Sequence, residues 1–367
     1  MEFRTIDDLN NIIKNNLYKL SDDIDLIVAI PRSGFLPATI ISLYLNIPLT
    51  DFDNFLNEKI YGIGTTKIKP GWITELSEAR KILIVEDSSI SGKSLEEAKQ
   101  KLEKSKYKDK CQFLTIFVTN ETKKFTDLYF NICPIPRMFE WNYIHHKGVS
   151  QACFDIDGVL CEDPTEQQND DGEKYIDFLK NAKPKFIPTF KIGYIVTARL
   201  EKYRKYTEEW LQKNNIKYDN LIMMDLPSKE ERVRLGNHGE FKGKNYKKLN
   251  NTNIFIESNY NQALEIARIS GKCVFCTENS KFINDSHMVK VKRKIKQEII
   301  QKIKRIIPKK LKKFLKKIIK HWFLEDNKNE NSSSRNRICR IIISNFIKSK
   351  EWSNGIRCST WKGGEDK

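Results

Sequence analysis

Apolar runs of strand length alternate with helix-length segments along most of the chain, and this alternation limits the folds that the chain can adopt. In the first half, strand-like runs lie at 25–30, 81–85 and 111–118, and helix-like segments lie at 35–45 and 94–105. Residues 1–20 also show apolar side chains at helical spacing. Strands that alternate with helices predict a parallel sheet, because each helix returns the chain to the edge where the next strand begins.

The pattern starts again at Ala152, which indicates a second α/β domain behind the first. Its further strands are predicted at 192–196, 220–224, 253–256 and 272–276, with helices at 200–213 and 259–269. The expected fold class is α/β, with two consecutive Rossmann-like parallel-sheet domains and a basic amphipathic helical tail. We place the domains at 1–147 and 150–285, the amphipathic segment at 288–324, and a linker-like tail at 325–367.

The chain carries a formal net charge of +17, and the position of that charge decides how it is interpreted. Residues 290–321 hold fifteen Lys or Arg and one acid, so this segment accounts for +14 of the total. Within 288–324, Ile, Leu and Phe recur every three or four positions opposite the basic side chains. This pattern is typical of helices that lie on anionic membrane surfaces. Nucleic acid is the weaker alternative, because Lys-rich helices also bind phosphate backbones.

Other features of the sequence favour the cytoplasm. The N-terminal residues lack a basic segment followed by an apolar run, so we expect no signal peptide. No apolar stretch approaches the ~20 residues of a membrane span. The eight cysteines are scattered, which favours a reducing compartment. We therefore expect a cytoplasmic protein that is peripheral at the inner face of the membrane.

The segment 82–94 places two acids between a strand and a helix. An apolar run forms the strand, and Glu86 and Asp87 stand at its carboxyl end, where open α/β sheets bind ligands. The turn that follows is rich in Ser and Gly, and its amides at the start of a helix suit a phosphate group. Carboxylates accept hydrogen bonds from neighbouring sugar hydroxyls. A sugar phosphate with a free diol satisfies both parts of the segment.

This segment resembles the phosphoribosyl-pyrophosphate (PRPP) motif of type I phosphoribosyltransferases at all of its positions. The resemblance implies that Glu86 and Asp87 hold the ribose hydroxyls and that 90–94 wrap the 5-phosphate. The earlier segment 30–34 resembles the pyrophosphate loop of that family, with Arg32 on the leaving pyrophosphate. The PRPP-binding residues implied in this way are Arg32, Ser33, Gly34, Glu86, Asp87, Ser88, Ser89, Ile90, Ser91, Gly92, Lys93 and Ser94.

Two further segments match that family by their position in the chain. Residues 51–75 show no regular period and take the place of its flexible lid. Lys59, Lys67 and Lys69 are the lid side chains that could cover an anion. Phe139 and Trp141 lie where the family places aromatic residues on the acceptor side. Because ribosyl transfer from PRPP has an oxocarbenium-like transition state, such an enzyme mainly positions the donor and stabilises departing pyrophosphate with Mg²⁺, amides and cations.

Asp155 and Asp157 stand two positions apart at the end of the strand that opens the second half. Alternation along a strand points both carboxylates to one side, and Gly158 lets the chain turn away. Two carboxylates this close favour Mg²⁺, which takes oxygen ligands. With a metal to neutralise charge, one carboxylate can attack phosphorus and the other can shuttle the proton of the leaving group.

Residues from about 150 to 280 resemble the haloacid-dehalogenase (HAD) superfamily, whose four motifs follow one another in order. The resemblance implies that Asp155 is the nucleophile, Asp157 the acid/base and Thr197 a phosphoryl ligand. The spacing of the motifs leaves room for only a minimal cap. An open site of this kind suits phosphate on a bulky or polymeric substrate.

The third and fourth HAD motifs match less closely. Lys242 is our preferred lysine of the third motif, with Lys244 and Lys229 as rivals. In the fourth motif, Glu257 would join Asp155 and Asp157 as a metal ligand. The second acid that the family commonly has is replaced by an amide, Asn259 or Asn261, so metal binding could be weaker.

The two resemblances together suggest a bifunctional enzyme. We expect transfer of 5-phosphoribosyl from PRPP to an acceptor, followed by removal of the 5-phosphate. This pairing resembles the ribofuranose-adding enzymes of bacterial surface polysaccharide synthesis, and a lipid-linked glycan acceptor at the membrane would explain the basic tail. Two alternatives stay open: a nucleobase phosphoribosyltransferase with a nucleotidase, acting in nucleotide salvage, and a PRPP-sensing regulator without catalysis.

Overall fold

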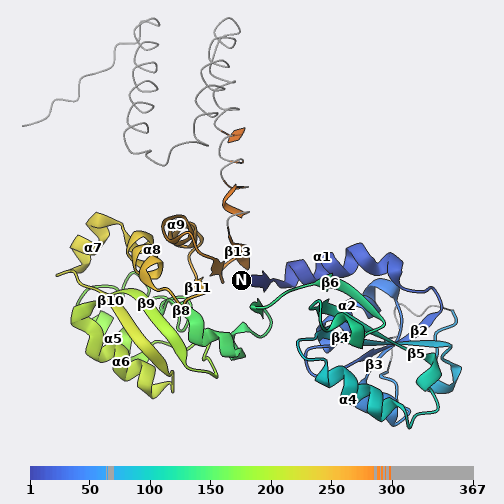
Figure 1. Cartoon of the computed structure of the whole chain (residues 1–367). Coiled ribbons are helices and arrows are strands. Elements are labelled where there is room, and N and C mark those ends of the chain that lie inside the picture. The colour runs from blue at the N-terminus through green and yellow to red at the C-terminus, as the bar shows by residue number, and fades with distance from the viewer. Residues whose placement is uncertain are drawn as a thin grey trace, which may run out of the picture. The chain divides into compact units, whose positions relative to one another are not determined.

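Two mainly parallel sheets with helices on both faces make up the chain as far as the structure describes it (Figure 1). The computed structural model describes residues 1–62, 64, 70–284, 287–289, 291, 294, 297 and 298. The described residues up to 291 belong to one compact unit. The predicted amphipathic segment 288–324 lies mostly, and the tail 325–367 wholly, outside the described residues. Both therefore stay expectations.

The first sheet has five strands in the order β3-β2-β4-β5-β6, and all of its neighbouring pairs are parallel. Its strands are β2 (Ile24–Ala29), β3 (Leu49–Asp51), β4 (Lys81–Ser88), β5 (Cys111–Val118) and β6 (Leu128–Ile132). The order reverses between β2 and β4, since β3 lies beyond one and β5 beyond the other. Open α/β sheets bind ligands at the carboxyl ends of the strands beside such a reversal.

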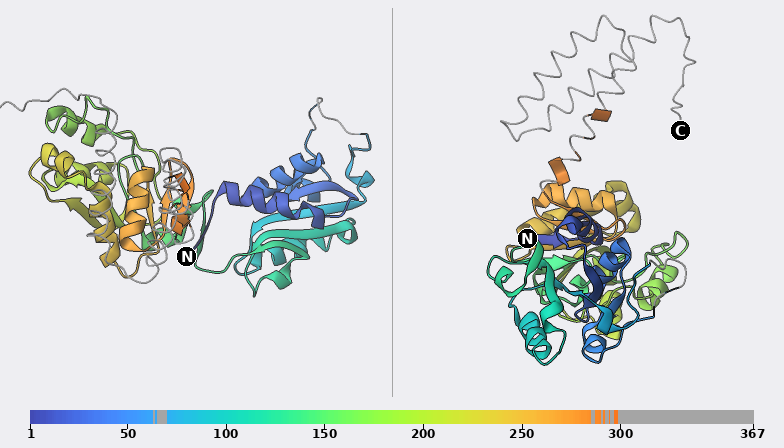
Figure 2. Two further views of the ribbon diagram at one scale, coloured as in Figure 1. Left: turned by 90° about the horizontal axis from the view of Figure 1, so that it is seen from above. Right: turned by 90° about the vertical axis from the view of Figure 1, so that its right-hand side faces the viewer.

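Helices cover both faces of the first sheet (Figure 2). They are α1 (Ile6–Asn16), α2 (Phe35–Leu45), α3 (Phe52–Leu56) and α4 (Lys93–Leu102). Since successive side chains of a strand point to opposite faces, β4 contributes to both layers of the core. Helices α1 and α2 pack with Leu83 and Val85, whereas α3 and α4 pack with Ile82 and Ile84.

The second sheet has the order β10-β9-β8-β11-β12-β13, and only its last pair is antiparallel. Its strands are β8 (Ala152–Phe154), β9 (Ile192–Leu200), β10 (Tyr218–Met224), β11 (Ile254–Glu257), β12 (Val274–Cys276) and β13 (Lys281–Ile283). The order reverses between β8 and β11, because β9 lies on one side of β8 and β12 lies beyond β11. The carboxyl ends of β8 and β11 therefore meet at a second ligand-binding position.

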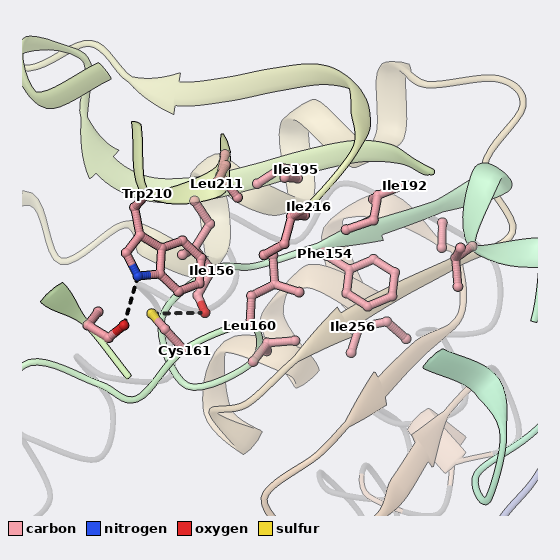
Figure 3. Close-up of a cluster of buried hydrophobic side chains, with 14 of the residues drawn as sticks. Phe154, Ile156, Leu160, Cys161, Ile192, Ile195, Trp210, Leu211, Ile216 and Ile256 are labelled. Atoms are coloured by element: carbon pink, nitrogen blue, oxygen red, sulfur yellow. Dashed lines mark hydrogen bonds between the residues drawn. The ribbon is translucent and has the colours of Figure 1, made fainter. Parts of the chain in front are cut away.

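The helices of the second sheet also divide between two core layers. They are α5 (Glu173–Asn181), α6 (Arg204–Lys213), α7 (Lys229–Leu235), α8 (His238–Lys248) and α9 (Tyr260–Ser270). Figure 3 shows the layer in which Phe154, Ile195 and Ile256 of three neighbouring strands meet Trp210 of α6. The buried Trp210 indole donates a hydrogen bond to the carbonyl oxygen of Ala182 at 2.7 Å. This bond satisfies the one polar group of an otherwise apolar side chain.

The start of the chain belongs to the core of the second sheet rather than the first. Strand β1 (Glu2–Arg4) pairs in parallel with β7 (Arg137–Phe139). Phe3 is 1% exposed, and its ring centroid lies 4.5 Å from that of Phe275 and 5.3 Å from that of Phe282. Helix α1 begins only at Ile6, so the first residues of the region with helical spacing form β1 and pair with β7 instead.

Several predicted elements are confirmed, some of them with the predicted bounds. The helix at 35–45 and the strand at 111–118 are observed as α2 and β5. The predicted strands at 192–196 and 220–224 are present but longer, as β9 and β10. The parallel α/β fold class is confirmed for the two sheets.

The expectation that 51–75 forms a loop without regular structure is wrong at its start. Helix α3 occupies Phe52–Leu56, and the Asp51 side chain caps it by accepting hydrogen bonds from two amides of its first turn. Phe52 and Phe55 are buried in the core of the first sheet. A five-residue helix is too short to show a helical period, so the sequence pattern could not indicate it.

Two further expectations concern the proposed lid and the membrane. Lys67 and Lys69 lie outside the described residues, and Lys59 is exposed. Among the described residues, the structure has no helix with the length and apolar character needed to cross a bilayer.

Candidate functional sites

The carboxyl ends of β2 and β4 bring the acidic pair together with the predicted pyrophosphate loop. The Ser33 hydroxyl donates to Asp87 Oδ1 at 2.9 Å, and the Trp141 indole donates to Asp87 Oδ2 at 2.9 Å. The Ser94 hydroxyl donates to Glu86 Oε2 at 3.2 Å. Glu86 and Asp87 are 6% and 2% exposed. Both carboxyl groups are thus buried and held by donors from other parts of the fold.

Two glycines shape the backbone around these acids. A Cβ atom on Gly34 would lie 2.4 Å from the carbonyl oxygen of Ile30 and 2.7 Å from that of Val85, so only glycine fits between β2 and β4. Gly92 has a φ of +83° and is the N-cap residue of α4, where it offers no side-chain cap. The Lys93 amide donates to the Ser91 hydroxyl at 3.4 Å, and the following amides of this helix start are suitable donors for a phosphate group.

Burial sets the electrostatics of the acidic pair. It raises the pKa of Glu86 to about 9, and the neighbouring Asp87 charge acts in the same direction. Glu86 is therefore a neutral carboxyl group at pH 7 in the unliganded protein. A neutral carboxyl group can donate as well as accept a hydrogen bond, which suits contact with a sugar hydroxyl.

The remaining PRPP candidates differ in exposure. Arg32, Ile90, Ser91 and Lys93 are exposed, and Lys93 forms an ion pair with Glu97 at 3.7 Å. Ser88 is half-buried and Ser89 is buried. The exposed side chains are accessible to a ligand, whereas the Ser89 side chain is buried within the turn.

Arg137 is a residue of this site that the sequence did not single out. It is 3% exposed and donates to the carbonyl oxygens of Ser89 at 2.8 Å and Cys133 at 2.7 Å. These bonds fix the turn that follows the acidic pair. The signal available in the sequence was a single arginine between Pro136 and an apolar pair, which indicates a buried guanidinium group only weakly.

The two aromatic candidates have different places. Phe139 is 5% exposed and belongs to the core of the first sheet. Trp141 is half-buried and stacks on Phe139 with a centroid distance of 4.7 Å and an interplanar angle of 10°. Because its indole also donates a hydrogen bond to Asp87, Trp141 lies at the acidic pair. Phe139 packs against the ring of Trp141 from the core.

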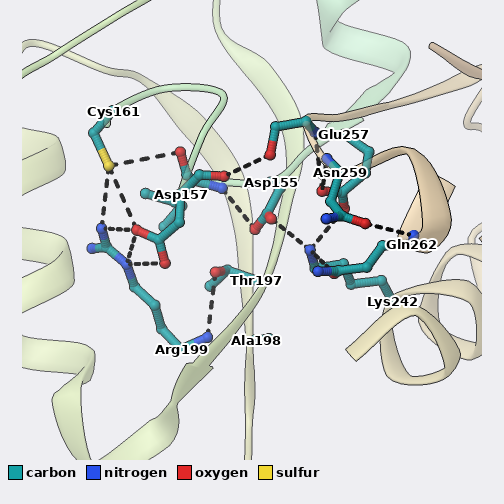
Figure 4. Close-up of polar contacts among 12 residues, drawn as sticks. Asp155, Asp157, Cys161, Thr197, Ala198, Arg199, Lys242, Glu257, Asn259 and Gln262 are labelled. Carbon is teal, nitrogen blue, oxygen red and sulfur yellow. Dashed lines mark hydrogen bonds and ion pairs between the residues drawn. The ribbon is translucent and has the colours of Figure 1, made fainter. Parts of the chain in front are cut away.

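The second site gathers polar side chains at the carboxyl ends of β8 and β11 (Figure 4). The Lys242 Nζ atom of α8 lies 2.5 Å from Asp155 Oδ2 and 2.7 Å from Glu257 Oε2. It also donates to the Gln262 side-chain oxygen at 2.9 Å. Lys242 is 2% exposed, so one buried ammonium group joins two carboxylates from neighbouring strands.

The electrostatics follow from this arrangement. Burial opposes the charge of Lys242, but Asp155 and Glu257 outweigh it and raise the pKa of Lys242. Burial raises the pKa of Glu257 to about 7, against the opposing effect of Lys242. Two amides, of Ser258 and Asn259, donate to Glu257 Oε1 at 3.0 and 3.1 Å.

The structure separates Lys242 from its two rivals. Lys244 is exposed and forms an ion pair with Glu240. The Lys229 ammonium group donates to the carbonyl oxygen of Asn169. Of the three lysines, Lys242 alone contacts Asp155.

Asp157 does not face the other two predicted metal ligands. Its carboxylate receives hydrogen bonds from Arg199, with the closest contact at 2.6 Å, and Arg199 is fully buried (Figure 4). Among the described residues, no three His, Cys, Asp or Glu side chains form a group that could hold a metal ion. The Asp157 carboxylate is thus paired with Arg199, whereas Asp155 and Glu257 are both paired with Lys242.

Two carboxylates of the set still suit a magnesium ion. Asp155 and Glu257 share the Lys242 ammonium group, so their oxygens lie close together. Mg²⁺ is commonly bound by one or two carboxylates together with water and substrate phosphate. The oxygen donors of Asp155 and Glu257 therefore fit this ion.

A cavity of about 510 Å³ opens onto the second site. Asp155, Asp157, Lys242 and Glu257 line it together with Thr197, which is 1% exposed. The lining thus combines carboxylates, an ammonium group and a hydroxyl group. Thr197 also accepts a hydrogen bond from the amide of Arg199 at 3.3 Å, which holds its side chain at the end of β9.

Comparison with known proteins identifies the first domain. The family model of the phosphoribosyl transferase domain matches residues 4–147. No curated protein sequence matches the chain. The first sheet with its helices is therefore a phosphoribosyltransferase-type domain.

Solved structures similar to the chain include two phosphoribosyltransferases. The xanthine-guanine-hypoxanthine phosphoribosyltransferase of Helicobacter pylori is 17% identical, with 38% of this chain and 91% of that chain covered and a TM-score of 0.29. The purine phosphoribosyltransferase of Pyrococcus horikoshii is 20% identical, with 38% and 95% covered and a TM-score of 0.27. A chain of the Pnkp1/Rnl/Hen1 RNA repair complex is 16% identical, with 72% and 98% covered and a TM-score of 0.24.

Proposed function

We propose that this chain transfers 5-phosphoribosyl from PRPP to an acceptor and then removes the 5-phosphate at the second site. The observation that carries the proposal is the contact of buried Lys242 with Asp155 and Glu257, in a chain whose first domain is of the phosphoribosyltransferase type. A transferase that uses PRPP leaves a 5-phosphate on its product. The carboxylates, Lys242 and Thr197 that line the cavity of the second site support hydrolysis of that phosphate there.

In the transfer step, the first site holds the donor. Glu86 and Asp87 receive the ribose hydroxyls, and the amides at the start of α4 receive the 5-phosphate. Arg32 is exposed and accessible to the leaving pyrophosphate, and a bound Mg²⁺ would supply further charge neutralisation there. Ser33 and Trp141 keep the Asp87 carboxylate in place for the diol.

In the hydrolytic step, an Asp155 oxygen attacks phosphorus, and the bond from phosphorus to the ribose oxygen breaks. Asp157 gives a proton to that departing oxygen and then takes one from the water that cleaves the phosphoaspartate. Lys242 and Thr197 stabilise the phosphoryl oxygens. Bound at Asp155 and Glu257, Mg²⁺ would neutralise charge between the nucleophile and the phosphate.

For the acceptor we propose a glycan, in particular a lipid-linked glycan at the inner membrane face. The basic, amphipathic sequence of 288–324 and the cavity beside Asp155 support this acceptor. A nucleobase is the second candidate. The half-buried Trp141 indole beside Asp87 favours it, because an aromatic face next to the ribose site could stack on a base.

One incubation distinguishes these acceptors. The full chain is supplied with PRPP and Mg²⁺, together with either a membrane glycolipid extract or a mixture of nucleobases, and pyrophosphate and phosphate are measured in turn. The glycan proposal predicts release of pyrophosphate and then phosphate with the extract only. Release of pyrophosphate and phosphate with nucleobases alone would favour the nucleobase acceptor of nucleotide salvage over the glycan. Binding of PRPP without release of pyrophosphate would indicate a regulator.

A further inference from the structure

The cavity of the second site has a polar wall that the proposed phosphatase chemistry does not use. Arg232 of α7 and His238 at the start of α8 line it, together with Asn169. Arg232 is 8% exposed. A phosphoryl group fills only a small part of a cavity of about 510 Å³, so this wall is available to the rest of the substrate.

Arg232 is held in place but is incompletely bonded. It donates to the carbonyl oxygen of Ala198 at 3.1 Å and to the Asn169 side-chain oxygen at 3.4 Å. Its Nε atom is buried and has no hydrogen-bond partner in the described part of the chain. Buried polar groups are nearly always paired, so the unpaired Nε atom leaves the guanidinium group beside the cavity with an unused donor.

His238 repeats this feature a few residues further along. Its Nε2 atom is also buried without a hydrogen-bond partner among the described residues. Burial lowers the pKa of His238, and the charges of Arg232 and Lys242 act in the same direction. A neutral imidazole presents one donor and one acceptor, a combination that suits a hydroxyl group.

The charge of the cavity favours a neutral ligand for this wall. The lining residues include five carboxylates and three cationic side chains. The five are Asp155, Asp157, Asp163, Glu257 and Glu278, and the three are Lys185, Arg232 and Lys242. A second anionic group would enter a site that already holds a phosphate and an excess of carboxylates. Hydroxyl groups avoid that repulsion and still satisfy both unpaired nitrogens.

We propose that Arg232 and His238 form a subsite that binds the hydroxyl groups of the sugar whose phosphate is removed. This inference rests on the proposed phosphatase function and names its substrate class as a monophosphate of a polyhydroxylated sugar such as a pentose. Arg232 sits beside Ala198, the residue after Thr197, so the sugar lies next to the phosphoryl group. The pair selects the substrate, while Asp155 and Lys242 carry out the chemistry.

Binding to the inactive Asp155→Asn protein tests this subsite without turnover. Ribose 5-phosphate and inorganic phosphate are titrated by calorimetry in the presence of Mg²⁺. We expect Arg232→Met and His238→Gln, each added to Asp155→Asn, to weaken ribose 5-phosphate binding at least about tenfold while phosphate binding changes less than about threefold. Arg234→Met is the matched control, because Arg234 is on the same helix but exposed and paired with Glu231.

The outcomes separate the subsite from the wider function. Equal losses of affinity for both ligands would place Arg232 on the phosphoryl group and would overturn the subsite. The subsite would also be overturned if neither variant lost affinity, or if ribose 5-phosphate did not bind at all. His238→Gln leaves the Arg232 bonds intact, so it decides the matter if Arg232→Met does not fold. If Asp155→Asn binds ribose 5-phosphate selectively but the unaltered chain never releases its phosphate, the phosphatase proposal fails and the subsite stands.

Discussion

At the scale of single residues, Lys242 connects the parts of the second site. Its ammonium group is buried between Asp155 and Glu257, which come from two neighbouring strands. A buried charge is tolerated when it is fully paired, and removing one partner leaves the others uncompensated. The same contact that positions the proposed nucleophile therefore also contributes to the stability of the fold.

Replacing Lys242 should affect stability and activity together. We expect Lys242→Met to lower the free energy of unfolding by about 3 kcal/mol, because two buried carboxylates lose their cation. It should also abolish phosphate release. Urea unfolding measures the first effect, and Lys244→Met, which changes an exposed lysine on the same helix, should show neither. A stable, active Lys242→Met protein would contradict the role of this contact.

Glu86 gives a residue-scale prediction about pH. Its carboxyl group titrates near 4.5 when unfolded and at about 9 in the unliganded fold. Between these values the folded state holds a proton that the unfolded state has lost, so stability falls as pH rises. We expect Glu86→Gln to gain stability relative to the unaltered chain from pH 5 to pH 9 in urea unfolding. Glu97→Gln, an exposed control, should not, and parallel curves for all three proteins would refute the raised pKa.

At the scale of elements, both sites lie where the strand order of a parallel sheet reverses. Strands β2 and β4 bring Ser33 to Asp87, and β8 and β11 bring Asp155 to Glu257. The close approach of β2 to β4 depends on Gly34, since a Cβ atom there would meet backbone oxygens rather than a flexible side chain. The geometry of the first site is thus a property of how two strands pack.

A methyl group at Gly34 should disturb that packing. We expect Gly34→Ala to destabilise the fold by about 2 kcal/mol, in the range of overpacked cores, and to weaken PRPP binding at least about tenfold. Gly172→Ala is the matched control, because a Cβ atom at Gly172 would come no closer than 3.6 Å to any residue beyond its two chain neighbours, and Gly172 lies outside the first site. Thermal unfolding and PRPP titration provide the measurements. Unchanged binding in Gly34→Ala would show that the loop adapts without loss.

The elements that the sequence predicted are those with a long, regular pattern. Helix α2 and strand β5 are long, mostly apolar segments that stand out from the more polar residues on either side of them. Helix α3 and strand β1 are too short for a period, and both exist because tertiary contacts bury Phe52, Phe55 and Phe3. Local pattern therefore predicted the framework, and packing decided the short elements.

Site residues also divide into those that the local sequence indicated and those that tertiary contacts determine. Motif position alone indicated Asp155, Glu86 and Asp87, and it favoured Lys242 over its rivals. The pairing of Asp157 with Arg199 and of Asp87 with Trp141 joins residues more than forty positions apart. Such contacts depend on the arrangement of strands in space, so a single sequence does not determine them.

At the scale of the whole molecule, the central claim is that two reactions follow one another on one chain. The first domain is of the phosphoribosyltransferase type, and we propose that the second site acts on the phosphate that the first leaves behind. The N-terminal strand β1 pairs with β7 and buries Phe3 in the core of the second sheet.

The most direct test of this claim is the mass of the product made by Asp155→Asn. The variant and the unaltered chain are each incubated with PRPP, Mg²⁺ and membrane glycolipid extract, and the products are analysed by mass spectrometry. Asp177→Asn, which changes an exposed aspartate of the second domain, is the control. We predict that Asp155→Asn releases pyrophosphate and accumulates a ribosylated product that retains its phosphate, whereas the other two proteins yield the product without it. A product that lacks phosphate in all three proteins would contradict the account.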